Sequence, residues 1–94
     1  MGKLYVVRIT QIATANNSMY KEGETIVAYA GKKRSYLFDN VAQPWFILFH
    51  GWGKRCHAQR VADEWNSEKI GQRYKMFDKV AVVEQFIGTS LGNN

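Results

Sequence analysis

Two segments of this chain carry apolar residues at both odd and even positions, which limits how they can fold. In the first, KLYVVRITQI at residues 3–12, Val6 lies on one face of an extended strand and Tyr5 and Val7 lie on the other. The second, KVAVVEQFI at residues 79–87, has the same pattern. Strands with two apolar faces are typical of the interior of a sheet. We therefore expect a sheet, with residues 3–12 as an interior strand.

Two shorter segments predict a β-hairpin with a basic tip. Residues 24–30, ETIVAYA, and 34–38, RSYLF, are rich in strand formers, and Gly31-Lys32-Lys33 between them is typical of a tight turn.

The run WFILF at residues 45–49 is apolar throughout and is bounded by Pro44 and Gly51. Because it is too short to make a helix by itself, we interpret it as a buried strand, with a helix as the alternative. On either interpretation, Trp45, Phe46 and Phe49 are expected in the core.

A helix is predicted from Lys54 to Asn66, because apolar residues recur there at helical spacing: Ala58, Val61, Ala62 and Trp65. The opposite side of this helix carries Cys56, Arg60, Asp63 and Glu64. Residues 67–77 allow two interpretations, a short turn around Ile70-Gly71 or a strand over 73–77.

These elements predict an α+β fold, namely a mostly antiparallel sheet of about four to five strands with one main helix, Lys54 to Asn66, packed on one face. The chain has 94 residues, enough for one hydrophobic core, so residues 1–94 are expected to form a single domain. The last residues, 88–94, are expected to be a frayed tail.

The positive charge of this chain is concentrated in its middle. Between residues 25 and 61 there is one acidic residue, Asp39, and there are six basic ones: Lys32, Lys33, Arg34, Lys54, Arg55 and Arg60. The rest of the chain is balanced, so this stretch accounts for the whole formal net charge of +5. A localised basic excess predicts an acidic partner, either nucleic acid or the acidic surface of another protein. The alternative is a solvated basic face.

No catalytic or metal-binding pattern stands out in the sequence. GxSxG, HExxH, CxxC and GxxxxGK[ST] are absent, and GWGKR lacks the spacing of a phosphate loop. A metal site would need Cys56, His57 and His50, but adjacent helix residues diverge by about 100°. We therefore expect no enzyme, no metal and no cofactor. The alternative is a cysteine-dependent enzyme, because a helix start beside Arg55 and Arg60 would activate the Cys56 thiol.

The sequence also bears on location. The start, MGKLYVVRITQ, lacks the apolar stretch of a signal peptide, and no segment is long enough to span a membrane. The single cysteine excludes an internal disulfide. We expect a soluble, cytoplasmic protein with no membrane partner.

The predicted helix begins with cations, against its own dipole. Lys54 and Arg55 stand at its start and acids stand near its end, whereas the dipole favours the reverse order by roughly 0.3–1 kcal/mol per charge. An anion bound here would meet free backbone N–H groups and both cations. Trp52, between two glycines, is expected to be an exposed aromatic contact. The alternative is that Trp52 folds back over the sheet edge.

Residues 32–65 combine a basic hairpin, an aromatic-glycine turn and a helix of pattern KRxxAxxxAxxW. This arrangement resembles the arm-type DNA-binding domain of phage integrases, which implies DNA contacts by Lys32, Lys33 and Arg34. In that family the helix is normally C-terminal, whereas here a further strand follows. As a whole, the chain is also similar to small accessory proteins of bacteriophages and prophages, including anti-CRISPR proteins, several of which block a host nuclease complex.

Two classes of function follow. The first is a phage-type inhibitor, a non-catalytic protein that engages an acidic surface or the nucleic-acid channel of a host defence or nucleic-acid-processing complex in the host cytoplasm. The second is a small, sequence-tolerant DNA- or RNA-binding protein. In both, the expected contact residues are Lys32, Lys33, Arg34, Trp52, Lys54, Arg55 and Arg60. Strands with two apolar faces also leave open a homodimer, in which a second copy completes the sheet.

Overall fold

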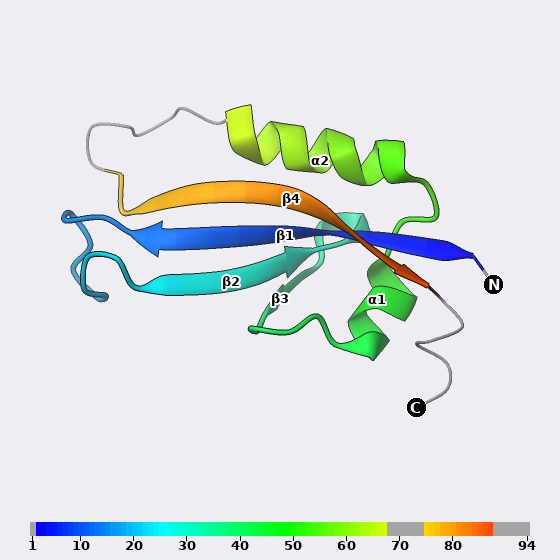
Figure 1. Ribbon diagram of the computed structural model, residues 1–94, viewed down its shortest axis with the longest axis horizontal. Coiled ribbons are helices and arrows are strands. Elements are labelled where there is room, and N and C mark those ends of the chain that lie inside the picture. The colour runs from blue at the N-terminus through cyan, green and yellow to red at the C-terminus, as the bar shows by residue number, and fades with distance from the viewer. Residues whose placement is uncertain (1, 68–74, 88–94) are drawn as a thin grey trace.

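The computed structural model describes residues 2–67 and 75–87, and within them four strands form one sheet (Figure 1). The strands are β1 (Lys3–Ala13), β2 (Thr25–Ala30), β3 (Tyr36–Phe38) and β4 (Phe77–Ile87). Their order is β3-β2-β1-β4, and every neighbouring pair is antiparallel. The expected α+β class is confirmed, and β1 lies in the interior of the sheet, as its two apolar faces predict.

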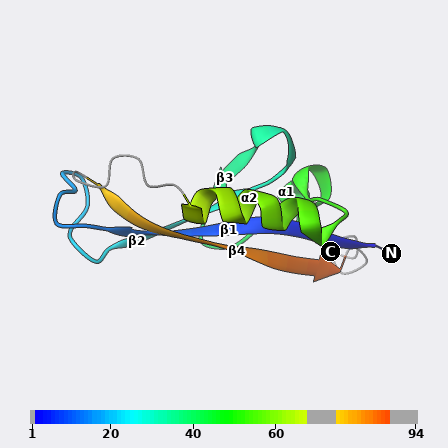
Figure 2. The same cartoon turned by 90° about the horizontal axis from the view of Figure 1, so that it is seen from above.

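The main helix, α2 (Arg55–Ser67), covers one face of the sheet (Figure 2). Ala58 and Ala62 are fully buried there, and their small side chains let the helix pack closely on the strands. The strand side of this cluster consists of Tyr5, Val7, Ile9, Ala30 and Ala81. Val61 and Trp65 pack at its margin, so the predicted apolar stripe is confirmed.

A second helix, α1 (Pro44–His50), packs on the opposite face, so the predicted buried strand at 45–49 is wrong. Phe46 and Ile47 are both buried in one cluster with strand residues. Neighbouring side chains point to opposite faces in a strand, whereas a helix brings both to the same core. Pro44 begins the helix, where its fixed φ and missing N–H are no handicap.

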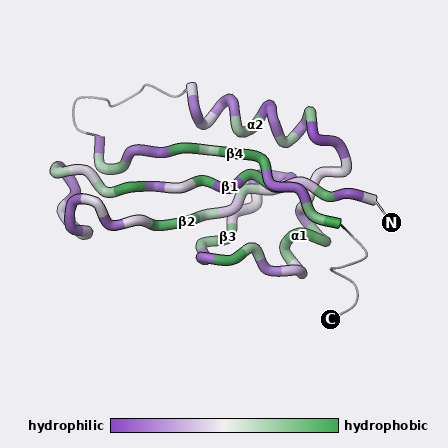
Figure 3. Tube along the Cα trace, viewed as in Figure 1, coloured by the Kyte–Doolittle hydropathy of each residue, from purple (hydrophilic) through white to green (hydrophobic). Residues whose placement is uncertain are grey.

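The outer side of α1 faces water, contrary to the expectation that Trp45 and Phe49 belong to the core. Trp45 is 50%, Leu48 is 46% and Phe49 is 75% exposed. Figure 3 shows that most of α1 is hydrophobic, whereas α2 alternates between polar and apolar stretches. Only one side of this short helix packs against the core, through Phe46 and Ile47.

Tyr29 belongs to the cluster under α1 and is almost completely buried. Its hydroxyl lies 3.5 Å from the carbonyl oxygen of Asn40 and is placed to donate to it. Burial, followed by the nearby carboxylate of Glu84, raises the pKa of the Tyr29 hydroxyl above its usual value of 10.0. The side chain is therefore a neutral hydrogen-bond donor at neutral pH.

The hairpin differs in detail from its prediction. Lys32–Arg34 form a single 3₁₀ turn, and the strand that follows, β3, has only three residues. Arg34 is thus part of the turn and not of the strand.

The predicted turn around Ile70-Gly71 and the tail at 88–94 lie outside the described residues. Of the alternative strand over 73–77, residues 75–77 are described, and only Phe77 belongs to a strand, β4. Neither helix in residues 2–67 and 75–87 has the length and apolar content needed to cross a bilayer.

Candidate binding surface

The turn Lys32–Arg34, called here the basic turn, has an unusual backbone. Lys33 has φ 60° and Arg34 has φ 57°, both in the left-handed region that side chains rarely adopt. Each such residue costs roughly 1–2 kcal/mol. The turn is closed by a hydrogen bond of 2.9 Å from the N–H of Gly31 to the carbonyl oxygen of Ser35. Strained backbone of this kind clusters at ligand-binding sites, which makes the turn a candidate on conformation as well as on charge.

Contacts with the end of α1 hold the basic turn in place. Ser35 Oγ and His50 Nδ1 lie 3.0 Å apart, within hydrogen-bond distance. A Cβ atom added to Gly31 would lie 2.5 Å from the carbonyl oxygen of His50, closer than real Cβ atoms come. Only glycine fits at this position, and its lack of a side chain lets the basic turn pack closely against the end of α1.

The start of α2 carries Lys54 and Arg55, both exposed as predicted. The two glycines before them have different roles. A Cβ atom on Gly51 would lie 2.5 Å from the carbonyl oxygen of Ile47, so Gly51 makes room for α1 and not for a ligand. A Cβ atom on Gly53 would meet nothing within 4 Å. The space beside Gly51 is therefore occupied by α1, whereas the space beside Gly53 is open.

Trp52 is partly buried and is not the exposed aromatic that was expected. Its backbone pairs with Tyr5 in a β-bridge, through N–H···O bonds of 2.9 and 2.8 Å. Its side chain packs against the cluster under α2. The structure agrees instead with the alternative expectation, in which Trp52 folds back over the sheet edge. The pairing follows from the end of β2 at Ala30, which leaves the edge of β1 free at Tyr5.

A groove of about 370 Å³ separates the basic turn from α2. We call it the aromatic groove; its lining includes Lys33, Arg34, Tyr36, Trp52, Val61, Glu64 and Trp65. The rings of Tyr36 and Trp65 meet edge to face, with centroids 6.0 Å apart. Lys79 Nζ lies 5.1 Å from the Trp65 centroid, which is within the range of a cation–π contact. Aromatic walls and cations thus surround one concave surface.

The structure brings only Lys33 and Arg34 of the predicted cations into this groove. The other four are exposed in the turn, just before α2 or on α2: Lys32, Lys54, Arg55 and Arg60. Within residues 2–67 and 75–87 the ion pairs are Arg8–Glu84 at 3.3 Å and Lys75–Asp78 at 3.2 Å. None of the six predicted cations therefore has an acidic side chain of these residues within 4.0 Å, and their charge is available to a partner.

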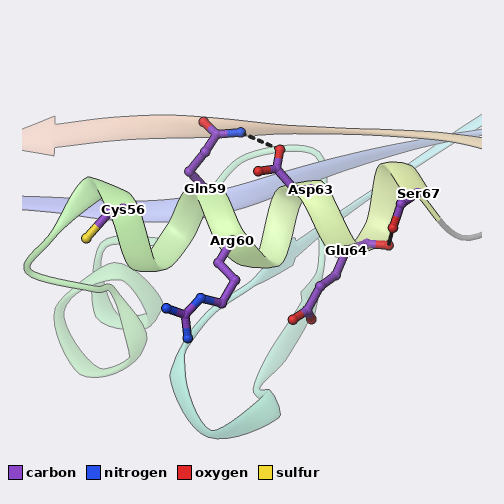
Figure 4. Close-up of a pocket in the computed structure, with 6 residues that line it drawn as sticks. All are labelled: Cys56, Gln59, Arg60, Asp63, Glu64 and Ser67. Carbon is purple, nitrogen blue, oxygen red and sulfur yellow. Dashed lines mark hydrogen bonds between the residues drawn. The ribbon is translucent and has the colours of Figure 1, made fainter.

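The outer surface of α2 forms a shallow hollow around Cys56 and Arg60 (Figure 4). All of its lining residues come from this one helix, and Gln59 donates to Asp63 at 2.9 Å within it. Cys56 is exposed and carries a free thiol. The hollow has no opposing wall among the described residues, and they contain no group of three or more His, Cys, Asp or Glu side chains that could hold a metal ion.

Reasoning from sequence missed two sets of exposed residues. The first is the outer side of α1, which was interpreted as core. The second is the pair Tyr36 and Phe38 on β3, which are 48% and 71% exposed. Their alternate spacing in RSYLF placed both on one face of a strand, but nothing in the sequence indicated that this face lies open.

No family model matches this chain, and neither a curated protein nor a solved structure shows significant similarity to it.

Proposed function

We propose that this protein is a non-catalytic binding protein whose partner is another protein. The observation that carries the proposal is the outer side of α1, where Trp45, Leu48 and Phe49 are exposed together. These residues are spaced i, i+3 and i+4, so they form one helical face. Large aromatic side chains at the centre of an interface provide most of its binding energy. Val41, which precedes the helix and is 65% exposed, adds to the same apolar character.

The charge of the surface indicates what kind of protein this partner is. Six exposed cations that form no ion pair among the described residues favour an acidic surface, through steering and complementarity. An inhibitor of the phage type, which occupies an acidic surface or the nucleic-acid channel of a host complex, would use an exposed apolar face and exposed cations of this kind.

The test is to replace an anchor residue without disturbing the core. A tagged chain is used to capture its partner from host lysate, and the purified partner is then titrated against variants. Phe49→Ser is expected to weaken binding by at least about tenfold, as for a residue at the centre of an interface. Met19→Ser is the matched control, because Met19 is 82% exposed in a distant loop. Equal affinities for the two variants would contradict the proposal.

Direct binding of nucleic acid is a second candidate, favoured by the strained basic turn. If phosphates bind there, the logarithm of the affinity falls linearly with the logarithm of salt concentration, by roughly 0.9 per duplex phosphate contacted. Gel shifts at about 50 and 200 mM salt measure this slope. Charge reversal at Lys33 and Arg34 is expected to weaken binding more than reversal at Lys54 and Arg55. Absence of any shift at the lower salt removes this candidate.

A further inference from the structure

Two exposed aromatic rings stand side by side on the edge strand β3, directly after the basic turn. Tyr36 pairs with Ala30 and Phe38 pairs with Ala28. Because paired residues share a face, and Ala30 belongs to the cluster under α2, both rings lie on the α2 side of the sheet. The contact between the rings of Tyr36 and Trp65, a residue of α2, agrees with this placement.

The spacing of the rings suits an extended ligand. Alternate residues of a strand are about 6.5–7 Å apart. Neighbouring aromatics on a sheet can each stack one base of an unpaired nucleic-acid strand. Tyr36 lines the aromatic groove with Lys33 and Arg34, so cations lie beside the first ring.

We propose that an unpaired strand of nucleic acid binds along β3, with one base stacked on Tyr36, the next on Phe38, and the backbone phosphates beside Lys33 and Arg34. This inference rests on the second candidate function and adds to it a site and a ligand class. A duplex does not meet these requirements, because its base faces are already stacked on one another and unavailable to the rings.

Two acidic residues restrict where the strand can run. Glu64 lines the aromatic groove on its α2 side. Asp39 follows Phe38 and lines a hollow of about 300 Å³ beyond it, with Asn40. Both carboxylates repel phosphates, so the backbone of the bound strand lies on the side of the basic turn and only the bases reach toward the rings.

The experiment compares a labelled single strand of about 12 nucleotides with a duplex of the same length, by fluorescence anisotropy at low salt. The wild-type protein is expected to bind the single strand more tightly. Phe38→Ala and Tyr36→Ala are each expected to weaken single-strand binding by about 5–100-fold, as the loss of one stacked base does. Tyr36→Phe is expected to retain binding.

Met19→Ala is the control, because Met19 is 82% exposed and lies in the loop between β1 and β2, away from both β3 and α1. Circular dichroism reports folding of each variant; if Tyr36→Ala unfolds, because Tyr36 contacts Trp65, Phe38→Ala decides alone.

The outcomes separate this inference from the function on which it rests. Equal binding of single strand and duplex, unaffected by Phe38→Ala, would overturn the inference and leave nucleic-acid binding standing. No binding of either form at low salt would overturn both, and would leave the protein partner proposed above as the ligand of the basic residues.

Discussion

At Gly31 the backbone of the last residue of α1 passes so close that no side chain fits, whereas Gly53 has open space around it. Both glycines directly precede lysines, and their sequence contexts look alike. The difference between them comes from His50, which is distant in sequence and adjacent in space. The close contact of Gly31 with His50 also holds the strained basic turn in position.

Replacing Gly31 with alanine is therefore expected to lower the free energy of unfolding by about 1–3 kcal/mol, because the backbone must shift to admit the methyl group. Gly53→Ala is the matched control and is expected to stay within about 0.5 kcal/mol of the wild type. Urea denaturation of the two variants measures both values. Similar losses in the two variants would show that the close contact at Gly31 is not what matters.

At the scale of elements, α1 shows why a short apolar run is ambiguous. Five residues cover barely one and a half turns, so neither a period of 2 nor one of 3.6 can be recognised in WFILF. The helix and the strand differ in which neighbours share a face, and only the core contacts of Phe46 and Ile47 decide between them. Pro44 is the one local sign of a helix start, because proline is favoured at the first position of a helix.

The adjacent residues Ile47 and Leu48 give a direct test of this helix. Ile47 is 1% and Leu48 is 46% exposed. Ile47→Ala is expected to lower the free energy of unfolding by about 2–5 kcal/mol, the range for a buried aliphatic residue. Leu48→Ala is expected to cost less than about 1 kcal/mol. Thermal or urea unfolding checks this, and a larger loss at Leu48 would mean that the helix is turned the other way.

At the scale of the whole molecule, α2 also protects an edge of the sheet. β4 lies at the edge although it has two apolar faces, and unpaired edges promote association. The side chain of Asn66 makes two 2.8 Å hydrogen bonds with the backbone of Ala81, one as donor and one as acceptor. It thus takes the place of a neighbouring strand at the centre of β4.

Asn66→Ala removes both bonds and leaves the N–H and C=O groups of Ala81 without partners. We expect a loss of about 1–3 kcal/mol in the free energy of unfolding, together with faster hydrogen exchange at the Ala81 amide. Gln59→Ala is the control on the same helix, because Gln59 bonds only Asp63 one turn away. An unchanged exchange rate at Ala81 would mean that Asn66 does not close this edge.

The sequence by itself determined the strands β1, β2 and β4, the helix α2 with its buried stripe, and the concentration of positive charge. Periodicity and composition act over a few neighbouring residues, and such signals can be recognised without a fold. The tertiary structure alone decided that WFILF is a helix, that Trp52 folds against Tyr5, and that Tyr36 and Phe38 lie open beside the basic turn. These features depend on which distant surfaces meet, because burial and close contact are properties of the packed chain and not of any one segment.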